Sequence, residues 1–74
     1  KIAKLKEYLS ALDNRELEIL TLRYGLFNEK EQTQKEIAKT YGISRSYVSR
    51  IEKRALAKLW QMFKKDEQNR KNVI

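Results

Sequence analysis

The sequence predicts an all-α fold, a single four-helix domain that contains a C-terminal helix-turn-helix without a wing. Three observations support this prediction: the 74 residues include no proline and only two glycines, 36% of them are charged, and apolar residues recur at helical spacing. A chain of this length forms one small domain and buries about 60 to 65% of its unfolded surface. We place this domain at residues 1–65 and expect residues 66–74, which lack apolar periodicity, to form a frayed tail.

The first two helices are predicted from apolar spacing and from a start signal. The first covers about residues 2–11, where apolar side chains recur at helical spacing: Ile2, Leu5, Tyr8, Leu9 and Leu12. Asp13 and Glu16 form a capping box that begins the second helix, and Gly25 ends it. The apolar face of this helix comprises Leu17, Leu20 and Tyr24, and Ile19, Leu22 and Leu26 make this face wider. Residues 27–32 suit a surface loop with one anchoring aromatic side chain, Phe27.

A helix-turn-helix is indicated by the spacing within residues 34–54, QKEIAKTYGISRSYVSRIEKR. Thr33 and Glu36 form a capping box for its first helix. Gly42 can adopt the left-handed conformation that ends this helix and turns the chain, and Ser44 caps the next helix. Both helix starts are therefore marked in the sequence.

The fourth helix begins near residue 44, runs past residue 63 and separates a polar face from an apolar one. Its apolar stripe comprises Val48, Ile51, Ala55, Leu59 and Met62. At about 100° per residue, the polar side chains fall within an arc of roughly 140°: Arg45, Ser46, Ser49, Arg50 and Lys53. A recognition helix presents this end to base edges, where arginine can bind guanine O6 and N7 and serine permits close approach. The pattern predicts DNA recognition, whereas Tyr47 and Trp60 are more typical of packing than of base stacking.

The net charge of +7 lies entirely in one part of the chain. Residues 1–32 contain six Lys/Arg and six Asp/Glu, residues 33–65 contain nine and two, and residues 66–74 contain two and two. A phosphate backbone attracts such a basic segment through counterion release. A membrane surface would attract it too, and an ordinary solvated face is the plain alternative, although such a face normally intersperses acids among its bases. Only Glu36 and Glu52 interrupt the segment here, which favours nucleic acid.

The composition also excludes several kinds of site. Without cysteine or histidine the chain has no disulfide, zinc-finger ligands, catalytic thiol or imidazole. We therefore expect no catalytic residue, no metal and no cofactor, and do not expect an enzyme. No apolar run approaches the roughly 20 residues that span a bilayer, and the amphipathic N-terminus lacks a signal-peptide core, so a soluble protein with a cytoplasmic location is expected. The chain begins within a helix pattern without methionine, which we interpret as an excised C-terminal fragment.

A family resemblance is carried by residues 12–59, LDNRELEILTLRYGLFNEKEQTQKEIAKTYGISRSYVSRIEKRALAKL, about two-thirds of the chain. This stretch resembles region 4 of the bacterial sigma-70 family of RNA polymerase sigma factors. Its specific parts are Arg15-Glu16, Arg23-Tyr24-Gly25-Leu26, Ile51-Glu52 and Ala55-Leu56. Within the family it is most similar to the sporulation factor sigma-K, with sigma-E and other sporulation factors remaining possible. The resemblance implies recognition of the promoter minus-35 element and docking on the β flap of core RNA polymerase, with an anti-sigma factor or activator as further partner.

The resemblance also implies roles for individual residues. The base-contacting set is Arg45, Ser46, Ser49 and Arg50. For the DNA backbone, the resemblance implies Arg15, Arg23, Gln34 and Lys35, and we expect Tyr47, Lys53 and Arg54 to belong to the same set. Of the base-contacting residues of primary sigma factors only Arg45 is retained, so the base preference should differ. Arg54 and Lys58 match basic positions of the primary sigma factor where activators dock. At the position of Trp60, however, the primary factor has a basic residue. Flap binding would fall on the apolar surface of the first three helices, which the sequence does not separate from core.

Two alternatives remain open at this point. A free-standing or receiver-linked helix-turn-helix regulator would need its own dimer interface and would prefer palindromic sites, whereas a sigma fragment should bind asymmetric sites as a monomer. An amphipathic helix that binds membranes is the other alternative. It fits poorly because the apolar stripe of the fourth helix is needed for packing against the other helices.

Overall fold

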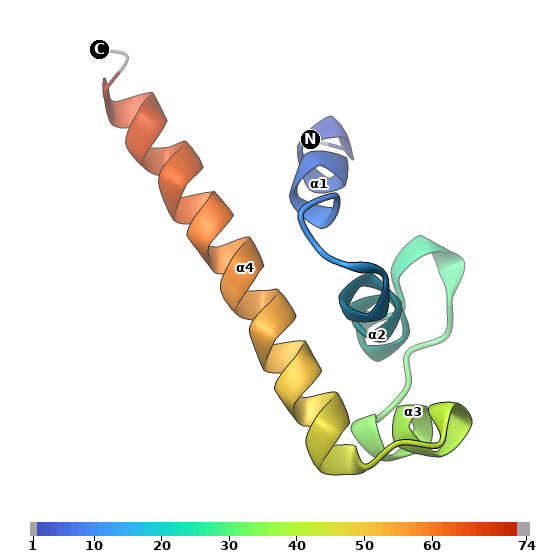
Figure 1. Cartoon of the computed structure of the whole chain (residues 1–74). Coiled ribbons are helices and arrows are strands. Elements are labelled where there is room, and N and C mark those ends of the chain that lie inside the picture. Colours follow the sequence, from blue (N-terminus) through green and yellow to red (C-terminus); the bar gives the residue numbers. More distant parts are fainter. Residues whose placement is uncertain (1, 73–74) are drawn as a thin grey trace.

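Four α-helices follow one another along the chain in the structure, a computed structural model that describes residues 2–72, with side chains for residues 6–68 (Figure 1). The elements are α1 (Ile2–Leu9), α2 (Asn14–Tyr24), the short 3₁₀ turn η1 (Leu26–Asn28), α3 (Gln34–Tyr41) and α4 (Arg45–Asn72). The described residues contain no strand, and the predicted all-α class is confirmed. None of the described helices combines the length and the apolar character needed to cross a membrane.

The predicted helix boundaries are set by side-chain caps and glycines. Asp13 Oδ1 accepts from the Glu16 N–H at 2.8 Å, while the Asp13 N–H donates to Glu16 Oε1 at 2.9 Å. The same reciprocal box joins Thr33 and Glu36 at the start of α3, at 3.1 and 2.8 Å. Ser44 Oγ accepts from the backbone N–H at position 47, at 3.0 Å, and so begins α4. The helices α2 and α3 both end at a left-handed glycine, with φ of 65° and 67°.

The long helix α4 forms the spine of the molecule, and the three shorter helices pack along one side of it (Figure 1). Two apolar clusters line this side. The first joins α2 and α3 to the start of α4 and comprises Ile19, Ile37, Ala38, Val48 and Ile51. The second joins α1 and α2 to the middle of α4 and comprises Leu9, Leu12, Leu20 and Ala55. Each large aliphatic side chain buried this way contributes about 1.5 to 3 kcal/mol to the stability of the fold. This burial stabilises a small domain whose sequence contains no cysteine for a disulfide.

Several details differ from the sequence prediction, and the first two concern where helices end. The helix α1 ends at Leu9 instead of near residue 11. The helix α4 continues to Asn72 instead of giving way to a frayed tail at residue 66, and residues 73–74 lie outside the described part. Lys64, Lys65, Glu67, Gln68, Arg70 and Lys71 are good helix formers, which favours helix here without apolar periodicity although Asp and Asn residues are interspersed. The Tyr8 hydroxyl also donates to Asp66 Oδ2 at 2.9 Å, which connects this part of α4 to α1.

Other differences concern the end of α2 and the segment after it. Phe27 was expected to anchor the loop, but its side chain is 60% exposed, so that expectation is wrong. Phe27 and Asn28 have φ of 55° and 68°, and this left-handed backbone leaves the aromatic ring at the surface. The loop is connected to α2 instead by a backbone hydrogen bond from the Gln32 N–H to the Leu22 carbonyl at 2.8 Å. The Tyr24 ring, expected on the apolar face, is 46% exposed.

Candidate nucleic-acid interface

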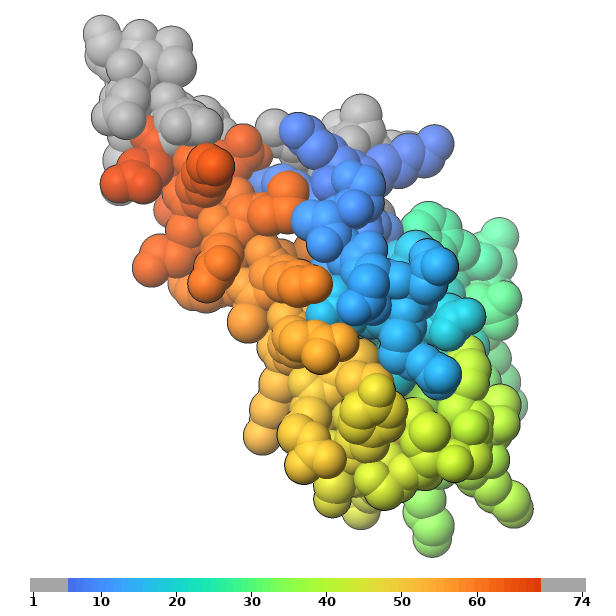
Figure 2. Space-filling model, viewed as in Figure 1, coloured from blue at the N-terminus to red at the C-terminus, as the bar shows by residue number. Residues whose placement is uncertain are grey.

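The helix-turn-helix occupies one end of the molecule. Figure 2 shows α3 and the first turns of α4 together forming this end. Between them the chain turns at the left-handed Gly42, and the Ile43 N–H donates to the Ala38 carbonyl at 3.0 Å. Val48 on α4 belongs to the same buried cluster as Ile37 and Ala38 on α3. The angle between the two helices is therefore set by packing, and the N-terminal turns of α4 are left facing solvent.

The four residues expected to contact bases all lie in these first turns of α4. Arg45, Ser46 and Arg50 are exposed, and Ser49 is half-buried. Within the described part of the chain, none of the four side chains forms a hydrogen bond or ion pair. Two guanidinium groups and two hydroxyl groups are thus available to an outside partner on one rigid element.

A surface hollow lies where the end of α2, the start of α3 and the start of α4 meet. We call it the α2–α3–α4 hollow; it is lined by Arg23, Thr33, Gln34, Lys35 and Arg45. Three of these residues are cations, and the positive end of the α3 dipole faces the same region. The first backbone N–H groups of a helix have no partner inside the helix, so they favour an anion. The hollow suits a phosphate chemically.

Glu52 lies beside this hollow and is 7% exposed. Its Oε2 atom accepts a hydrogen bond from the Tyr24 hydroxyl at 2.6 Å, and its Oε1 atom accepts one from Gln34 Nε2 at 2.8 Å. Arg23 Nε lies 3.5 Å from Oε1. The hydrogen bond to the Glu52 carboxylate, together with burial, raises the pKa of Tyr24. We call this group the Glu52 clamp.

The Glu52 clamp was not predicted from the sequence, where Glu52 is noticeable only as an acid within the basic segment. A signal was present: at about 100° per residue, Glu52 lies within about 40° of Val48, at the edge of the apolar stripe. A carboxylate in such a place must find hydrogen-bond donors when it is buried. The amide nitrogen of Gln34 is occupied by it, so the side chain of Gln34 has less capacity for a phosphate than its backbone N–H.

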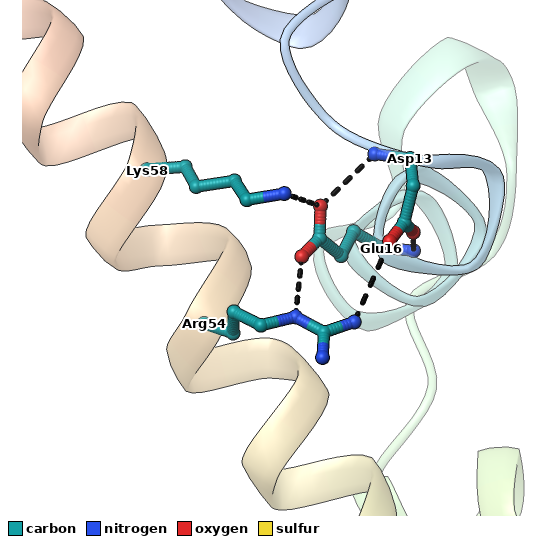
Figure 3. Close-up of polar contacts among 4 residues, drawn as sticks. All are labelled: Asp13, Glu16, Arg54 and Lys58. Carbon is teal, nitrogen blue, oxygen red and sulfur yellow. Dashed lines mark hydrogen bonds and ion pairs between the residues drawn. The ribbon is translucent and has the colours of Figure 1, made fainter.

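A second buried carboxylate, Glu16, connects the start of α2 to the opposite edge of the α4 stripe (Figure 3). Its side chain has no exposed surface. Arg54 Nε donates to Oε2 at 2.6 Å, and Lys58 Nζ donates to Oε1 at 2.8 Å. Burial raises the pKa of this carboxyl, but the hydrogen bonds from Lys58, from the Asp13 N–H and from Arg54 outweigh it and lower the pKa to about 2. We call this group the Glu16 clamp.

The Glu16 clamp changes the interpretation of Arg54, which was expected to contact the DNA backbone. Arg54 lies about 180° around α4 from Arg45 at about 100° per residue. Its guanidinium binds Glu16 at 2.6 Å and lies 3.5 Å from Asp13, so acids of α2 already occupy it. Lys58 is engaged in the same way. We therefore leave Arg54 out of the proposed phosphate contacts.

The remaining predicted DNA-backbone residues are spread more widely. Arg15 lies away from the hollow, with its guanidinium carbon 5.0 Å from the centre of the Tyr41 ring and its NH1 nitrogen buried without a hydrogen-bond partner in the described structure. Tyr47 is 43% exposed, and Lys53 is exposed. Arg23 lies 3.5 Å from Glu52 and 3.9 Å from Glu31.

Two apolar surfaces remain exposed elsewhere. Trp60, expected to pack, is 58% exposed and stacks on Phe63 with ring centres 5.8 Å apart, so that expectation is wrong. Lys64 Nζ lies 5.7 Å from the centre of the Trp60 ring. A groove between α2, η1 and the end of α3 is the other apolar surface. We call it the α2–η1 groove, and its apolar lining residues are Leu17, Leu22, Phe27 and Tyr41.

The comparison with known families decides the class of this domain. The profile of the family described as Sigma-70, region 4 matches residues 8–61. The chain belongs to this family. Membership confirms the resemblance found in the sequence and makes the chain a helix-turn-helix DNA-binding domain of the sigma-factor class, not an enzyme.

Individual relatives agree with this assignment. The chain is 55% identical over 71 residues to the RNA polymerase sigma-28 factor of Bacillus thuringiensis subsp. kurstaki. This aligned region covers 96% of the chain and 30% of the relative. It is 52% identical over 71 residues to the RNA polymerase sigma-K factor of Bacillus subtilis (strain 168), covering 96% and 24%. It is 53% identical over 51 residues to the RNA polymerase sigma-E factor of Clostridium acetobutylicum, covering 69% and 22%. The chain thus spans less than a third of the length of these relatives.

Proposed function

We propose that this domain recognises the minus-35 element of promoter DNA as part of a sigma factor that directs RNA polymerase to its start sites. The observation that carries the proposal is the set of four unpartnered polar side chains on the exposed first turns of α4, beside the cationic α2–α3–α4 hollow. The similarity to sigma-K and sigma-E factors supports a role in sporulation. The proposed setting is the bacterial cytoplasm, with the domain acting as a monomer on an asymmetric site.

The proposed contacts divide into two groups. Arg45, Ser46, Ser49 and Arg50 contact base edges in the major groove, with the two arginines suited to guanine. Phosphates are bound around the α2–α3–α4 hollow by Arg23, by Lys35 and by the backbone N–H of Gln34. Lys53 and Tyr47 flank the base-contacting turns, and Arg15 is the most distant member of the phosphate group.

Two single substitutions test this division. Arg50→Ala should weaken binding to the preferred site by about 1 to 3 kcal/mol and relax the preference at one base pair, because it removes a base contact. Lys35→Ala should weaken binding to all DNA sequences to a similar degree and reduce the salt dependence of binding, because it removes a phosphate contact. Fluorescence anisotropy on preferred and random duplexes at several salt concentrations measures both. Equal loss on both duplexes for Arg50→Ala would refute its base-contacting role.

We propose further that the α2–η1 groove binds the β flap of core RNA polymerase. The groove lies on α2, η1 and the end of α3, and its apolar side chains are accompanied by Glu18, Thr21 and Glu29. Phe27 in this groove is 60% exposed and has a left-handed backbone, so its ring is available to a partner. The groove is formed by residues outside the base-contacting turns, so both partners can bind together.

An NMR titration of the labelled domain with an isolated β-flap fragment tests this docking. We expect amide shifts around Leu17, Leu22 and Phe27, and a weaker complex for Phe27→Ala. Trp60→Ala serves as the control, since it removes an exposed aromatic side chain outside the groove. Absence of shifts at millimolar flap would contradict the docking and would favour a free-standing regulator.

A free-standing helix-turn-helix regulator is the second candidate function. The exposed pair Trp60 and Phe63 favours it, because a dimer could bury this face of α4. Sedimentation of the domain on selected DNA distinguishes the two: a monomer on asymmetric sites supports the sigma factor, and a dimer on palindromic sites supports the regulator. The activator contact implied at Arg54 and Lys58 receives no support, because Glu16 occupies both side chains.

A further inference from the structure

We propose that Glu52 is a positioning residue for DNA recognition, which fixes the phosphate-binding start of α3 relative to the base-contacting turns of α4. The inference rests on the proposed function. Glu52 would not touch DNA itself. Its effect would pass through Gln34 and Arg23, the two residues of the α2–α3–α4 hollow that it contacts.

The geometry of the Glu52 clamp carries this inference. Glu52 and Arg45 are seven residues apart, so at about 100° per residue they differ by only about 20° in direction and lie along one row of α4. Gln34 is the first residue of α3, and its amide nitrogen lies 2.8 Å from Glu52 Oε1. One carboxylate therefore ties the first turn of α3 to the helix that carries the base-contacting side chains. Tyr24, at the end of α2, closes the same clamp at 2.6 Å.

The Glu16 clamp and the Glu52 clamp should have different roles, the first in the stability of the domain and the second in positioning its DNA contacts. The Glu16 clamp joins α2 to α4 through Arg54 and Lys58, and neither of them lines the hollow. The Glu52 clamp joins three helices, and two of its members line the hollow. Loss of Glu16 should therefore affect mainly the free energy of unfolding, whereas loss of Glu52 should affect how well phosphate and base contacts form at once.

Electrostatics gives the positioning role a distinctive signature. Removing the Glu52 carboxylate takes a negative charge from beside Arg23, which makes the hollow more attractive to any phosphate. Binding to random DNA should then stay the same or tighten. Binding to the preferred site should weaken, because it requires the correct spacing between phosphate and base contacts. A purely structural defect would weaken both, and a purely electrostatic effect would tighten both.

The test compares dissociation constants on duplexes selected from a random pool by the unaltered domain with those on random duplex. For Glu52→Ala we expect the ratio of specific to random affinity to fall at least tenfold, with random affinity unchanged or up to about threefold tighter. Glu67→Ala is the matched control, because it removes an exposed carboxylate from the same helix, and it should preserve the ratio. Circular dichroism melts verify that each variant is folded.

A second variant keeps the test decisive if Glu52→Ala does not fold. Gln34→Ala removes the α3 partner while Glu52 keeps its contacts with Tyr24 and Arg23, and it should lower the same ratio. In the double variant Glu52→Ala/Gln34→Ala, the ratio of specific to random affinity should be little lower than in either single variant, because both substitutions break the same hydrogen bond. An unchanged ratio in Gln34→Ala and in a folded Glu52→Ala, or a parallel loss on both duplexes, would overturn the inference. Absence of any preferred site for the unaltered domain would instead overturn the proposed function.

Discussion

Replacing Val48 with aspartate is expected to unfold the domain. Val48 has no exposed surface and lies in the cluster that joins α2, α3 and α4. A carboxylate there would be buried without a partner, which costs several kcal/mol whether it stays charged or takes up a proton. A domain of this size has a total free energy of unfolding of only about 4 to 11 kcal/mol. Circular dichroism should show the helical signal reduced and the cooperative melt lost at room temperature.

An aspartate elsewhere on the same helix provides the control for Val48→Asp. Gln61 is exposed on α4, so Gln61→Asp introduces the same side chain in water and should melt close to the unaltered protein. If Val48→Asp melted at the same temperature as Gln61→Asp, the packing of the helix-turn-helix described above would be wrong.

Removing the Glu16 carboxylate should produce the second-largest effect. Glu16→Ala is expected to lower the free energy of unfolding by about 2 to 3 kcal/mol at pH 7, because it removes the capping-box acceptor and two partly buried charge-assisted hydrogen bonds. The loss stays below that of a fully buried pair, since the Arg54 and Lys58 side chains are 56% and 41% exposed and can turn to water. Urea denaturation followed by circular dichroism measures the difference.

The same carboxylate predicts a pH dependence. The pKa of Glu16 is about 2 in the folded protein against an ordinary value of 4.5, so the unfolded chain binds the proton more readily. Its stabilisation, up to about 3 kcal/mol, is complete above about pH 4.5 and is lost as the pH falls toward about 2. Glu16→Gln should therefore approach the unaltered protein in stability at pH 2 and lie well below it at pH 7.

Glu18→Gln is the control for this pH dependence, because Glu18 is an exposed acid on the same helix. It should follow the stability curve of the unaltered protein at every pH. A constant difference between Glu16→Gln and the unaltered protein from pH 2 to pH 7 would show that the Glu16 carboxyl titrates normally and that the clamp does not form.

Local signals in the sequence were sufficient for the secondary structure and for the exposed face of α4. Asp13 with Glu16 and Thr33 with Glu36 are capping boxes that act within three residues, and Gly25 and Gly42 end helices through their own backbone. Apolar period alone placed Val48, Ile51 and Ala55 inside. Because the apolar side of α4 packs in the core, Arg45 and Arg50 on its other side could be predicted to face solvent.

The sequence by itself thus determined the helices, their caps, the basic face and the family. Only the tertiary structure decided the partners of the buried charges: Glu16 with Arg54 and Lys58, 38 and 42 residues apart, and Glu52 with Tyr24 and Gln34, 28 and 18 residues apart. It also decided that Phe27 and Trp60 remain at the surface. The physical reason is range. Caps and amphipathic periods depend on neighbours within a turn, whereas a buried charge or an exposed ring depends on which distant helix packs against it.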